Sequence, residues 1–328
     1  MSRPGRFILA ALGLAALVGA FVGLRLWSAY VDSGPSLTAV QLVIPRASSG
    51  SATAALLADR GVIASPLAFR MGTFLDGTAA RMKAGEYVFP AGASARAAGD
   101  LLASGQTVRR RFTIAEGLTV VQVMAQLRGA EGMEGEILTV PDEGSLLPET
   151  YFYSWGDART RTIERAQRAM REAMAELWPR RAPDLPLADA TSALVLASIV
   201  ERETAIAEER PRVAAVFLNR LRLKMRLQAD PTVVYGLDPS GVLGRPLSRA
   251  DLEARNPWNT YVVDGLPPTP IANPGRASIE AVLTPAKSDD LYFVANGEGR
   301  HVFSRTLAEH NRNVSRLREI ERSRTQRN

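Results

Sequence analysis

Two glutamates at the end of an apolar segment are the strongest catalytic candidates in this chain. The pattern predicts a helix over residues 187–203, and no charged residue occurs between Thr191 and Val200, just before Glu201 and Glu203. A carboxyl group placed there loses hydration and lies near the negative end of the helix dipole, and both effects raise its pKa. A shift of about two units, or roughly 2.7 kcal/mol, keeps a glutamic acid protonated near neutrality, as a general acid requires.

The two glutamates cannot serve one site, because positions two residues apart on a helix differ by about 200°. Glu201 continues the apolar register, whereas Glu203 adjoins Arg202 and the charged residues 208–210. We therefore predict that Glu201 is the general acid and that Glu203 is a surface residue. The alternative is that both simply end the helix in a solvated ion cluster.

Polar residues in two turn-rich segments are candidates for positioning a substrate or supporting the acid: Gln228, Asp230, Tyr235, Asn259 and Tyr261. Amide and hydroxyl groups beside aromatic rings suit a carbohydrate, which offers both stacking faces and neutral hydrogen-bonding groups. The alternative is structural: a turn in which Asp230 bonds its own backbone, and a proline-stiffened loop packed on the core.

Several other chemistries are excluded by what the sequence lacks. There is no cysteine, so disulfides, thiolate catalysis and iron–sulfur clusters are excluded. The two histidines, His301 and His310, lack metal-ligand spacing, and His301 is expected to be a structural residue on a strand. Nucleophile-elbow, P-loop and dinucleotide-binding motifs are also missing. We predict no metal and no cofactor.

The charge distribution argues against nucleic acid as a partner. The chain has 40 basic and 34 acidic residues, a net charge of +6. Residues 312–327 alone contain six arginines and two glutamates, so +4 of this charge lies in a short C-terminal tail. The remainder is close to neutral and has no strong electrostatic footprint for DNA or RNA.

The amino terminus predicts a membrane anchor. Residues 7–24 form an uncharged run of 18 residues, which as a helix spans about 27 Å, close to the thickness of a bilayer core. Arg3 and Arg6 precede the run, and Trp27 follows it. We predict a cytoplasmic segment 1–6, a transmembrane helix 7–27, a polar linker 28–38, and export of everything beyond. The alternative is a cleaved signal peptide with a small-residue site at Val18–Ala20.

The rest of the chain has room for about two domains and predicts an α+β fold. Short elements over residues 39–112 predict a small α/β module, including helices at 66–75 and 95–104 and a strand at 85–89. Longer helices at 160–177, 187–203 and 211–222 predict a larger α+β domain over residues 113–313. Beyond residue 230 we expect loops and short strands at 261–263, 291–294 and 301–303, followed by a basic tail at 314–328.

Several segments, taken in order, form a recognisable series: Glu116-Gly-Leu-Thr119, Glu143-Gly-Ser-Leu-Leu-Pro-Glu-Thr-Tyr151, Ile199-Val-Glu-Arg-Glu-Thr204, Gln228-Ala-Asp-Pro-Thr232, Asn259-Thr-Tyr261 and Gly265-Leu-Pro-Pro268. This series resembles the YceG-like family of endolytic murein transglycosylases, with Glu149 and Arg202 as small departures from its pattern. The resemblance covers about residues 39–313.

The resemblance implies an enzyme of the cell inner membrane with a periplasmic LysM-like module ahead of its catalytic domain. It implies cleavage within nascent glycan strands to leave a 1,6-anhydroMurNAc end, a reaction that could terminate strand elongation, with Glu201 carrying the family's catalytic carboxyl group. A lytic transglycosylase of this kind needs one acid, whereas a glycosidase needs two carboxylates at a defined separation. Peptidoglycan strands are the implied substrate, and peptidoglycan synthases or the elongation and division machinery are the implied protein partners. The alternative is a membrane-tethered, non-catalytic peptidoglycan-binding protein.

Overall fold

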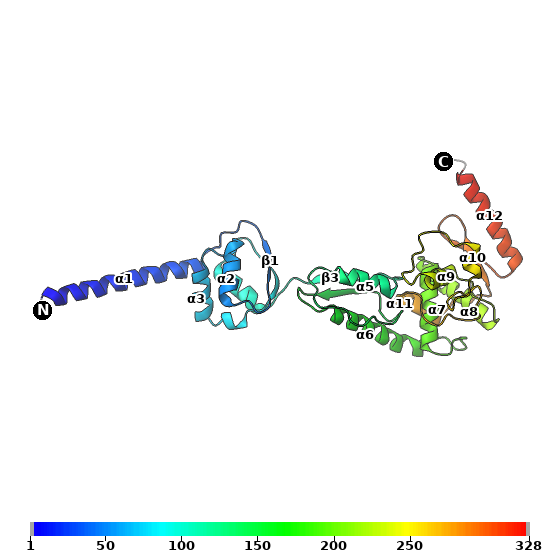
Figure 1. Ribbon diagram of the computed structural model, residues 1–328, viewed down its shortest axis with the longest axis horizontal. Helices are drawn as coiled ribbons and strands as arrows, with labels where there is room; N and C mark the ends of the chain where they lie inside the picture. The colour runs from blue at the N-terminus through cyan, green and yellow to red at the C-terminus, as the bar shows by residue number, and fades with distance from the viewer. Residues whose placement is uncertain (1–2, 326–328) are drawn as a thin grey trace. The chain divides into compact units, whose positions relative to one another are not determined.

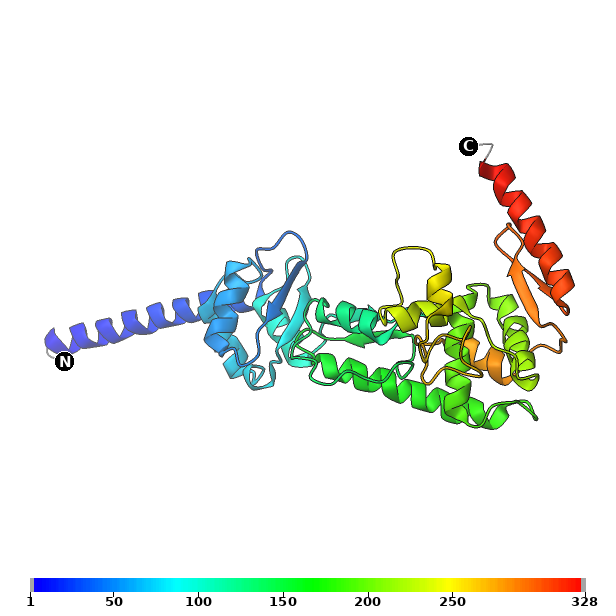
Figure 2. The same cartoon turned by 45° about the vertical axis from the view of Figure 1, so that its right-hand side comes forward.

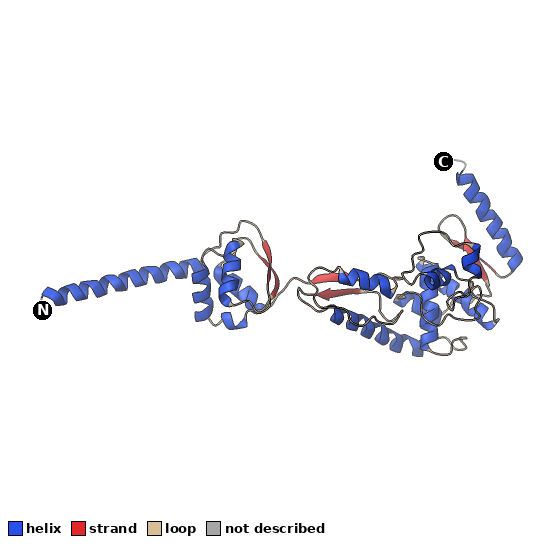
Figure 3. Ribbon diagram, viewed as in Figure 1, coloured by secondary structure: helices blue, strands red, loops and turns tan. Residues whose placement is uncertain are grey.

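The chain is a mixed α+β protein made of two compact units (Figures 1 and 3). The computed structural model describes the backbone of residues 3–325 and the side chains of residues 10–324. The first unit comprises Met1–Arg110 and Phe152–Asp157, and the second comprises Arg111–Tyr151 and Ala158–Asn328. The α+β class predicted from the sequence is confirmed.

A single long helix, α1 (Arg3–Val31), opens the first unit. Residues Ala10–Val31 are long and apolar enough to cross a membrane, and the 18-residue stretch within them that meets this criterion is not buried. Arg3 and Arg6, on which the predicted orientation depends, lie outside the residues whose side chains are described. One helix of this length and composition is consistent with a single-pass anchor.

The expected free linker over residues 28–38 is not found. The helix α1 continues to Val31, and Tyr30 is buried in the core of the module that follows. Beyond it, the Gly34 N–H donates to the Gly92 carbonyl at 3.1 Å, and the Gly92 N–H donates to the Ser36 carbonyl at 2.8 Å. The segment predicted as a tether is therefore fastened to the module.

The module in the first unit has the order strand, helix, helix, strand, helix. Its elements are β1 (Val40–Ile44), α2 (Gly50–Asp59), α3 (Pro66–Leu75), the short 3₁₀ helix η1 (Ala79–Arg81), β2 (Gly85–Phe89) and α4 (Ala95–Ser104). The two strands are antiparallel, with Val40 opposite Phe89 and Ile44 opposite Gly85. Serine side chains cap the N-termini of all three α-helices, which satisfies backbone donors there. The helices predicted at 66–75 and 95–104 and the strand at 85–89 are confirmed.

The second unit is predominantly helical. Its elements are β3 (Arg110–Thr113), which pairs with β4 (Thr150–Tyr153), then α5 (Val120–Arg128), α6 (Arg159–Leu177), η2 (Trp178–Arg180), α7 (Ala190–Glu203), η3 (Ala207–Glu209), α8 (Arg210–Arg222), α9 (Asp230–Leu237), α10 (Arg249–Glu253), α11 (Arg276–Leu283), β5 (Tyr292–Ala295), β6 (His301–Ser304) and α12 (Leu307–Thr325). The core forms where α7 packs against α8 and α11. The strands β5 and β6 form an antiparallel hairpin with Tyr292 opposite Ser304.

Three expectations for the carboxyl-terminal third are wrong. Residues 230–283 contain the helices α9, α10 and α11 rather than loops and strands, and residues 261–263 form turns instead of a strand. The predicted tail at 314–328 is, as far as it is described, part of α12, which lies along the β5–β6 hairpin (Figure 2). Residues 326–328 of that tail lie outside the described part.

Candidate active site

The helix α7 carries both candidate glutamates to the centre of the second unit. The Asp189 carboxylate caps its first turn by accepting a hydrogen bond from the Ser192 N–H at 2.7 Å. The helix then runs through buried apolar residues, including Leu196 and Val200, that pack against its neighbours. Other parts of the unit cover α7 on all sides. Glu201 and Glu203 lie on different sides of its last turn, so their carboxyl groups have different surroundings.

Glu201 is part of a buried ion pair. Its side chain is 4% exposed, and its Oε1 accepts a hydrogen bond from Arg210 Nη2 at 3.1 Å. Its other oxygen accepts from the Gly275 N–H at 2.8 Å, and Arg210 also contacts the Glu116 carboxylate at 3.1 Å. The apolar surroundings expected from the sequence are thus found along the helix, while the carboxylate itself is held by a cation and a backbone donor.

Glu203 is not the solvated surface residue that the sequence suggested. It is half-buried and lines a cavity of about 530 Å³ in the second unit. Burial, with a smaller contribution from the negative charge of Asp230, raises its pKa from 4.5 to about 8. The effect predicted for Glu201 therefore operates on Glu203.

The cavity has the mixed polar and aromatic lining of a small-molecule site. The α7, α8 and α9 helices contribute Glu203, Phe217, Arg220 and Asp230; the intervening loops contribute Leu227, Gln228 and Tyr261; and the β5 strand and α12 contribute Tyr292, Phe293, Val294, Leu307, His310, Asn311 and Val314. Because Val314 belongs to this lining, the boundary predicted at residue 313 cuts through the wall of the cavity.

Arg220 is the cation of this cavity, and its position is fixed by the backbone. Its Nε donates to the Leu291 carbonyl at 2.7 Å, and its Nη1 donates to the Leu227 carbonyl at 2.8 Å. The guanidinium also lies 5.1 Å from the centre of the Tyr292 ring. Burial lowers the pKa of Arg220, although a guanidinium stays charged throughout the physiological range. A fixed positive charge therefore faces the site that contains Glu203.

Three of the five predicted positioning residues line this cavity: Gln228, Asp230 and Tyr261. The Tyr261 hydroxyl donates to Asp230 Oδ1 at 2.6 Å, and the Gln228 N–H donates to the Thr260 carbonyl at 3.1 Å. Gln228 has a φ of 52°, in the left-handed region that non-glycine residues rarely adopt, and such strain often accompanies functional sites. These contacts fix the Tyr261 and Asp230 side chains and the Gln228 backbone in the wall of the cavity that Glu203 also lines.

Tyr235 has a different partner. Its hydroxyl lies 3.3 Å from the Glu143 carboxylate, and its ring packs edge-on against Trp258 with the ring centres 5.8 Å apart. Glu143 also accepts from the Val120 N–H at 2.9 Å, at the start of α5. Burial raises the pKa of Glu143 to about 7. Sequence reasoning did not single out Glu143, because its burial depends on α5 and α9, which are distant in sequence.

Asn259 is used to terminate α10. Its side chain is buried, and its Nδ2 approaches the Asp251, Leu252 and Ala254 carbonyls at 3.2, 3.1 and 2.8 Å. Its Oδ1 accepts from the Tyr261 N–H at 3.0 Å. The Nδ2 and Oδ1 groups of Asn259 thus both have backbone partners. The bond to Oδ1 positions Tyr261, whose hydroxyl bonds Asp230.

Asn259→Ala should lower the free energy of unfolding by about 1–3 kcal/mol, because it leaves buried carbonyl groups without their donor. Thermal unfolding followed by circular dichroism measures this loss. The matched variant is Gln228→Ala, which changes a residue lining the cavity and should reduce turnover by about 10–100-fold with a smaller effect on stability. An unchanged melting temperature for Asn259→Ala would contradict the structural role given to this amide.

The two histidines differ in their surroundings. His301 Nδ1 lies 2.6 Å from the Glu209 carboxylate, and its ring packs edge-on against Phe293, which confirms the expected structural role. His310 lines the cavity and stacks on Tyr292 with ring centres 5.1 Å apart. Burial, with a smaller contribution from the Arg220 charge, lowers the pKa of His310 and favours the neutral imidazole. No sequence signal identified His310, because α12 brings it to the cavity from far along the chain. Across residues 10–324, no group of three or more His, Cys, Asp or Glu side chains is arranged to hold a metal ion.

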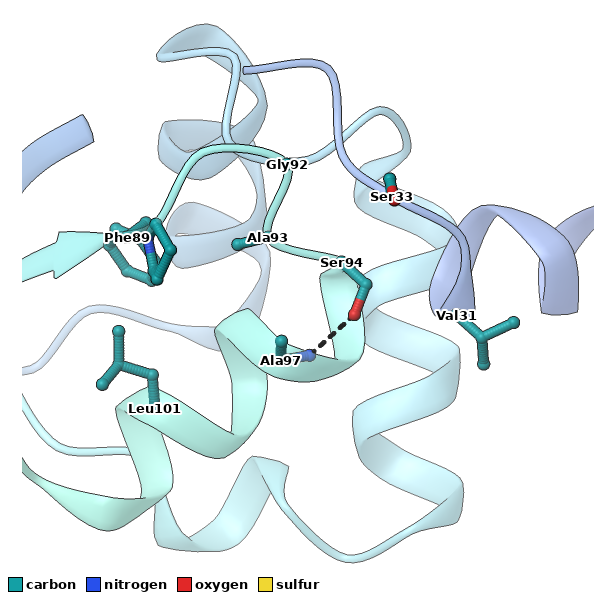
Figure 4. Close-up of a pocket in the computed structure, with 9 residues that line it drawn as sticks. Val31, Ser33, Phe89, Gly92, Ala93, Ser94, Ala97 and Leu101 are labelled. Atoms are coloured by element: carbon teal, nitrogen blue, oxygen red, sulfur yellow. Dashed lines mark hydrogen bonds between the residues drawn. The ribbon is translucent and has the colours of Figure 1, made fainter. Parts of the chain in front are cut away.

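A second cavity, of about 430 Å³, lies in the first unit between the end of α1, the end of β2 and α4 (Figure 4). Its lining includes Phe89, Leu101 and the hydroxyl-bearing Ser33 and Ser94. The Ser94 hydroxyl already accepts the Ala97 N–H at 3.1 Å as the cap of α4. The described lining contains no titratable side chain, so this cavity offers no acid or base for catalysis.

Comparison with known proteins assigns the chain to a family. A sequence profile of the YceG-like family matches residues 42–316, which include most of the module, both glutamates and the start of α12. The chain belongs to the YceG-like family. The match confirms the resemblance found in the sequence.

Two relatives of this YceG-like chain are named endolytic murein transglycosylase. The protein from Bacillus subtilis strain 168 is 33% identical over 310 residues, which cover 84% of each chain. The protein from Streptococcus pneumoniae serotype 2 strain D39 is 33% identical over 180 residues, which cover 53% of this chain and 32% of the relative. A 2.6 Å crystal structure of a YceG-like protein from Listeria monocytogenes is 29% identical and superposes with a TM-score of 0.51, covering 84% of this chain and 98% of that one.

Proposed function

We propose that this YceG-like protein is a lytic transglycosylase that cleaves peptidoglycan glycan strands internally and that Glu203 is its general acid. The class of enzyme follows from family membership and from 33% identity to an endolytic murein transglycosylase over most of both chains. The observation that carries the assignment of the acid is the position of Glu203 in a cavity of about 530 Å³ with its pKa raised to about 8.

This proposal replaces the assignment of the acid to Glu201. A general acid must reach the leaving oxygen and must be protonated before the reaction. Glu201 is 4% exposed, and both of its oxygens already accept hydrogen bonds. Glu203 lines the cavity, and no hydrogen bond or ion pair to its carboxyl group occurs among the described residues. Its carboxyl group is therefore free to meet a substrate.

One carboxyl group can carry out both proton transfers of the reaction. The Glu203 carboxyl proton passes to the glycosidic oxygen as the bond from C1 of the MurNAc residue to that oxygen breaks, and the N-acetyl group stabilises the positive centre left at C1. The resulting carboxylate then accepts the proton of the C6 hydroxyl while the C6 oxygen bonds to C1, which closes a 1,6-anhydro ring. Glu203 ends protonated, and no water, metal or cofactor is consumed.

The surroundings of Glu203 suit both stages. Before proton transfer, burial and the Asp230 charge favour the neutral acid. After transfer, the positive charge of Arg220 stabilises the Glu203 carboxylate. The same charge lowers the pKa of Glu203 and so partly opposes the effect of burial. The rings of Tyr261 and Tyr292 line the same cavity and can pack against sugar faces.

The test of the proposed function is digestion of purified sacculi followed by mass spectrometry of the products. Fragments ending in 1,6-anhydroMurNAc are expected from the full chain and not from Glu203→Gln. Fragments with reducing ends would instead indicate a hydrolase. Retention on sacculi without any released product would favour the alternative, a peptidoglycan-binding protein.

Activity should fall as the pH rises through about 8. The acid must be protonated, and the raised pKa keeps most of Glu203 protonated at pH 7 and most of it ionised at pH 9. Initial rates on a soluble glycan, measured from pH 6 to pH 10, should show this upper limb. A rate that already declines between pH 4 and pH 6 would contradict the proposed protonation state.

The placement of the enzyme is part of the proposal. The helix α1 serves as a single-pass anchor in the inner membrane, with residues 1–6 in the cytoplasm and both units in the periplasm. The strand–helix–helix–strand order of the module, with antiparallel strands, supports the LysM-like assignment and a role in binding glycan. We also propose that the enzyme terminates strand elongation. Its proposed protein partners are peptidoglycan synthases or the elongation and division machinery.

A further inference from the structure

The exposed face of α3 carries four large apolar side chains. Leu67, Met71, Phe74 and Leu75 are 53%, 45%, 78% and 75% exposed. Their spacing of four, three and one places them on one side of the helix, opposite Ala68, Phe69, Gly72 and Thr73, which are buried. Single exposed apolar residues are ordinary, whereas a contiguous stripe marks an interaction surface.

The helix α3 is attached directly to the end of the membrane helix. Tyr30 of α1 packs so closely on Gly72 that a Cβ added there would lie 2.5 Å from the tyrosine ring. The Tyr30 hydroxyl also hydrogen-bonds the Asp76 carboxylate, just after α3. These contacts hold α3 at the point where α1 enters the module.

Very little chain separates the lipid-facing part of α1 from the module. Leu24 is 66% exposed, and Leu26, two residues later, already packs on the module core. Two residues of helix rise about 3 Å, less than the thickness of the interfacial region of a bilayer. Trp27 lies at the same level and is 54% exposed, as suits a residue at the membrane–water boundary.

The position of α3 within the module agrees with a surface that faces the bilayer. Figure 1 shows α3 at the edge of the module from which α1 leaves, with β1 at the opposite edge. The exposed Arg70, one turn before Phe74, lies at the edge of the stripe, where its long side chain can reach a lipid phosphate.

We infer that the exposed face of α3 is a membrane-binding surface, which lies in the phospholipid leaflet that α1 crosses and holds the module against it. This inference rests on the proposed anchoring by α1. A lipid leaflet is the partner because the leaflet that surrounds Leu24 must extend beside the module, on whose core Leu26 already packs. Insertion of the stripe into the leaflet removes four large apolar side chains from water, which favours the membrane-bound arrangement.

The chain has no cysteine, so a single introduced thiol can carry a probe. We would label Phe74→Cys with an environment-sensitive fluorophore and place the full chain in vesicles of phosphatidylethanolamine and phosphatidylglycerol. Nitroxide lipids with the spin label near the headgroups should quench this probe several-fold. The matched control is Val88→Cys, on β2 of the same module, which is 44% exposed and should not be quenched.

A third probe separates this inference from the anchoring on which it depends. Val18→Cys, within the apolar run of α1, should be quenched by nitroxides near the bilayer centre. If Val18→Cys is quenched and Phe74→Cys behaves like Val88→Cys, the anchor stands and the inference is overturned. If neither Val18→Cys nor Phe74→Cys is quenched, both the anchoring by α1 and the membrane-binding role of α3 are contradicted. Energy transfer between Phe74→Cys probes on different copies, without quenching by lipid, would identify the stripe as a self-association surface and would also overturn the inference.

Discussion

Glu203→Gln is expected to reduce turnover by about 10²–10⁴ while the protein remains folded. The amide has nearly the same shape as the carboxylic acid, so the packing at the end of α7 is kept. It has no proton that can pass to the glycosidic oxygen, and it cannot accept one from the C6 hydroxyl, so both stages of the reaction suffer. Release of 1,6-anhydro fragments, measured at several substrate concentrations, gives the change in turnover.

The stability of the same variant provides an internal check. The raised pKa means that the folded state favours the protonated acid, so the wild type loses stability as the pH rises from 4.5 towards 8. The amide does not ionise, and Glu203→Gln should therefore lose less stability over that range. A variant that is inactive because it is unfolded would fail this check, and a fully active Glu203→Gln would remove Glu203 from the mechanism.

Glu201→Gln is expected to act mainly on stability, with a loss of about 1.5–3 kcal/mol in the free energy of unfolding. Both members of the Glu201–Arg210 pair are at least 90% buried, and the substitution removes the negative charge that balances the guanidinium. Chemical denaturation measures the loss. Activity per folded molecule should stay within about tenfold of the wild type, since the proposed acid is unchanged.

The matched control is Glu116→Gln, at the other carboxylate that contacts Arg210. The Glu116 side chain is 45% exposed, so water compensates for much of its lost charge and the effect on stability should be smaller. If Glu201→Gln folds normally and is inactive while Glu203→Gln is active, the original assignment of the acid to Glu201 is correct. Equal losses of stability in Glu201→Gln and Glu116→Gln would contradict the greater contribution expected from the more buried carboxylate.

The sequence located the helix turn that carries both glutamates but favoured Glu201, whereas the proposal made from the structure favours Glu203. Helix geometry correctly separated Glu201 from Glu203, because that angle depends only on local structure. The apolar pattern of the sequence could not show which glutamate is more buried, because α7 has buried residues on all of its sides. The deciding groups come from elsewhere: Gly275 supplies a donor to Glu201, and α12 helps to enclose the cavity at Glu203.

Local signals predicted the elements that depend on local chemistry. The bounds of α3, α4 and β2 follow from serine caps, Gly105 in the left-handed conformation at the end of α4, and Pro90 after the strand. The short helices α9, α10 and α11 were missed, because five to eight residues are too few to establish a helical period. The arginines of α12 suggested a solvated tail, although Leu307 and Val314 of the same helix line the cavity.

Titration of the Glu203 carboxyl group tests the central claim most directly. Carbon NMR of protein labelled at its glutamate carboxyl groups, with the signal assigned by its absence from Glu203→Gln, gives the midpoint for this one residue. A midpoint near 8 is expected for a carboxyl group that stays protonated at neutral pH in its cavity. A midpoint near the ordinary value of 4.5 would show a carboxylate at neutral pH and would contradict the assignment of Glu203 as the acid.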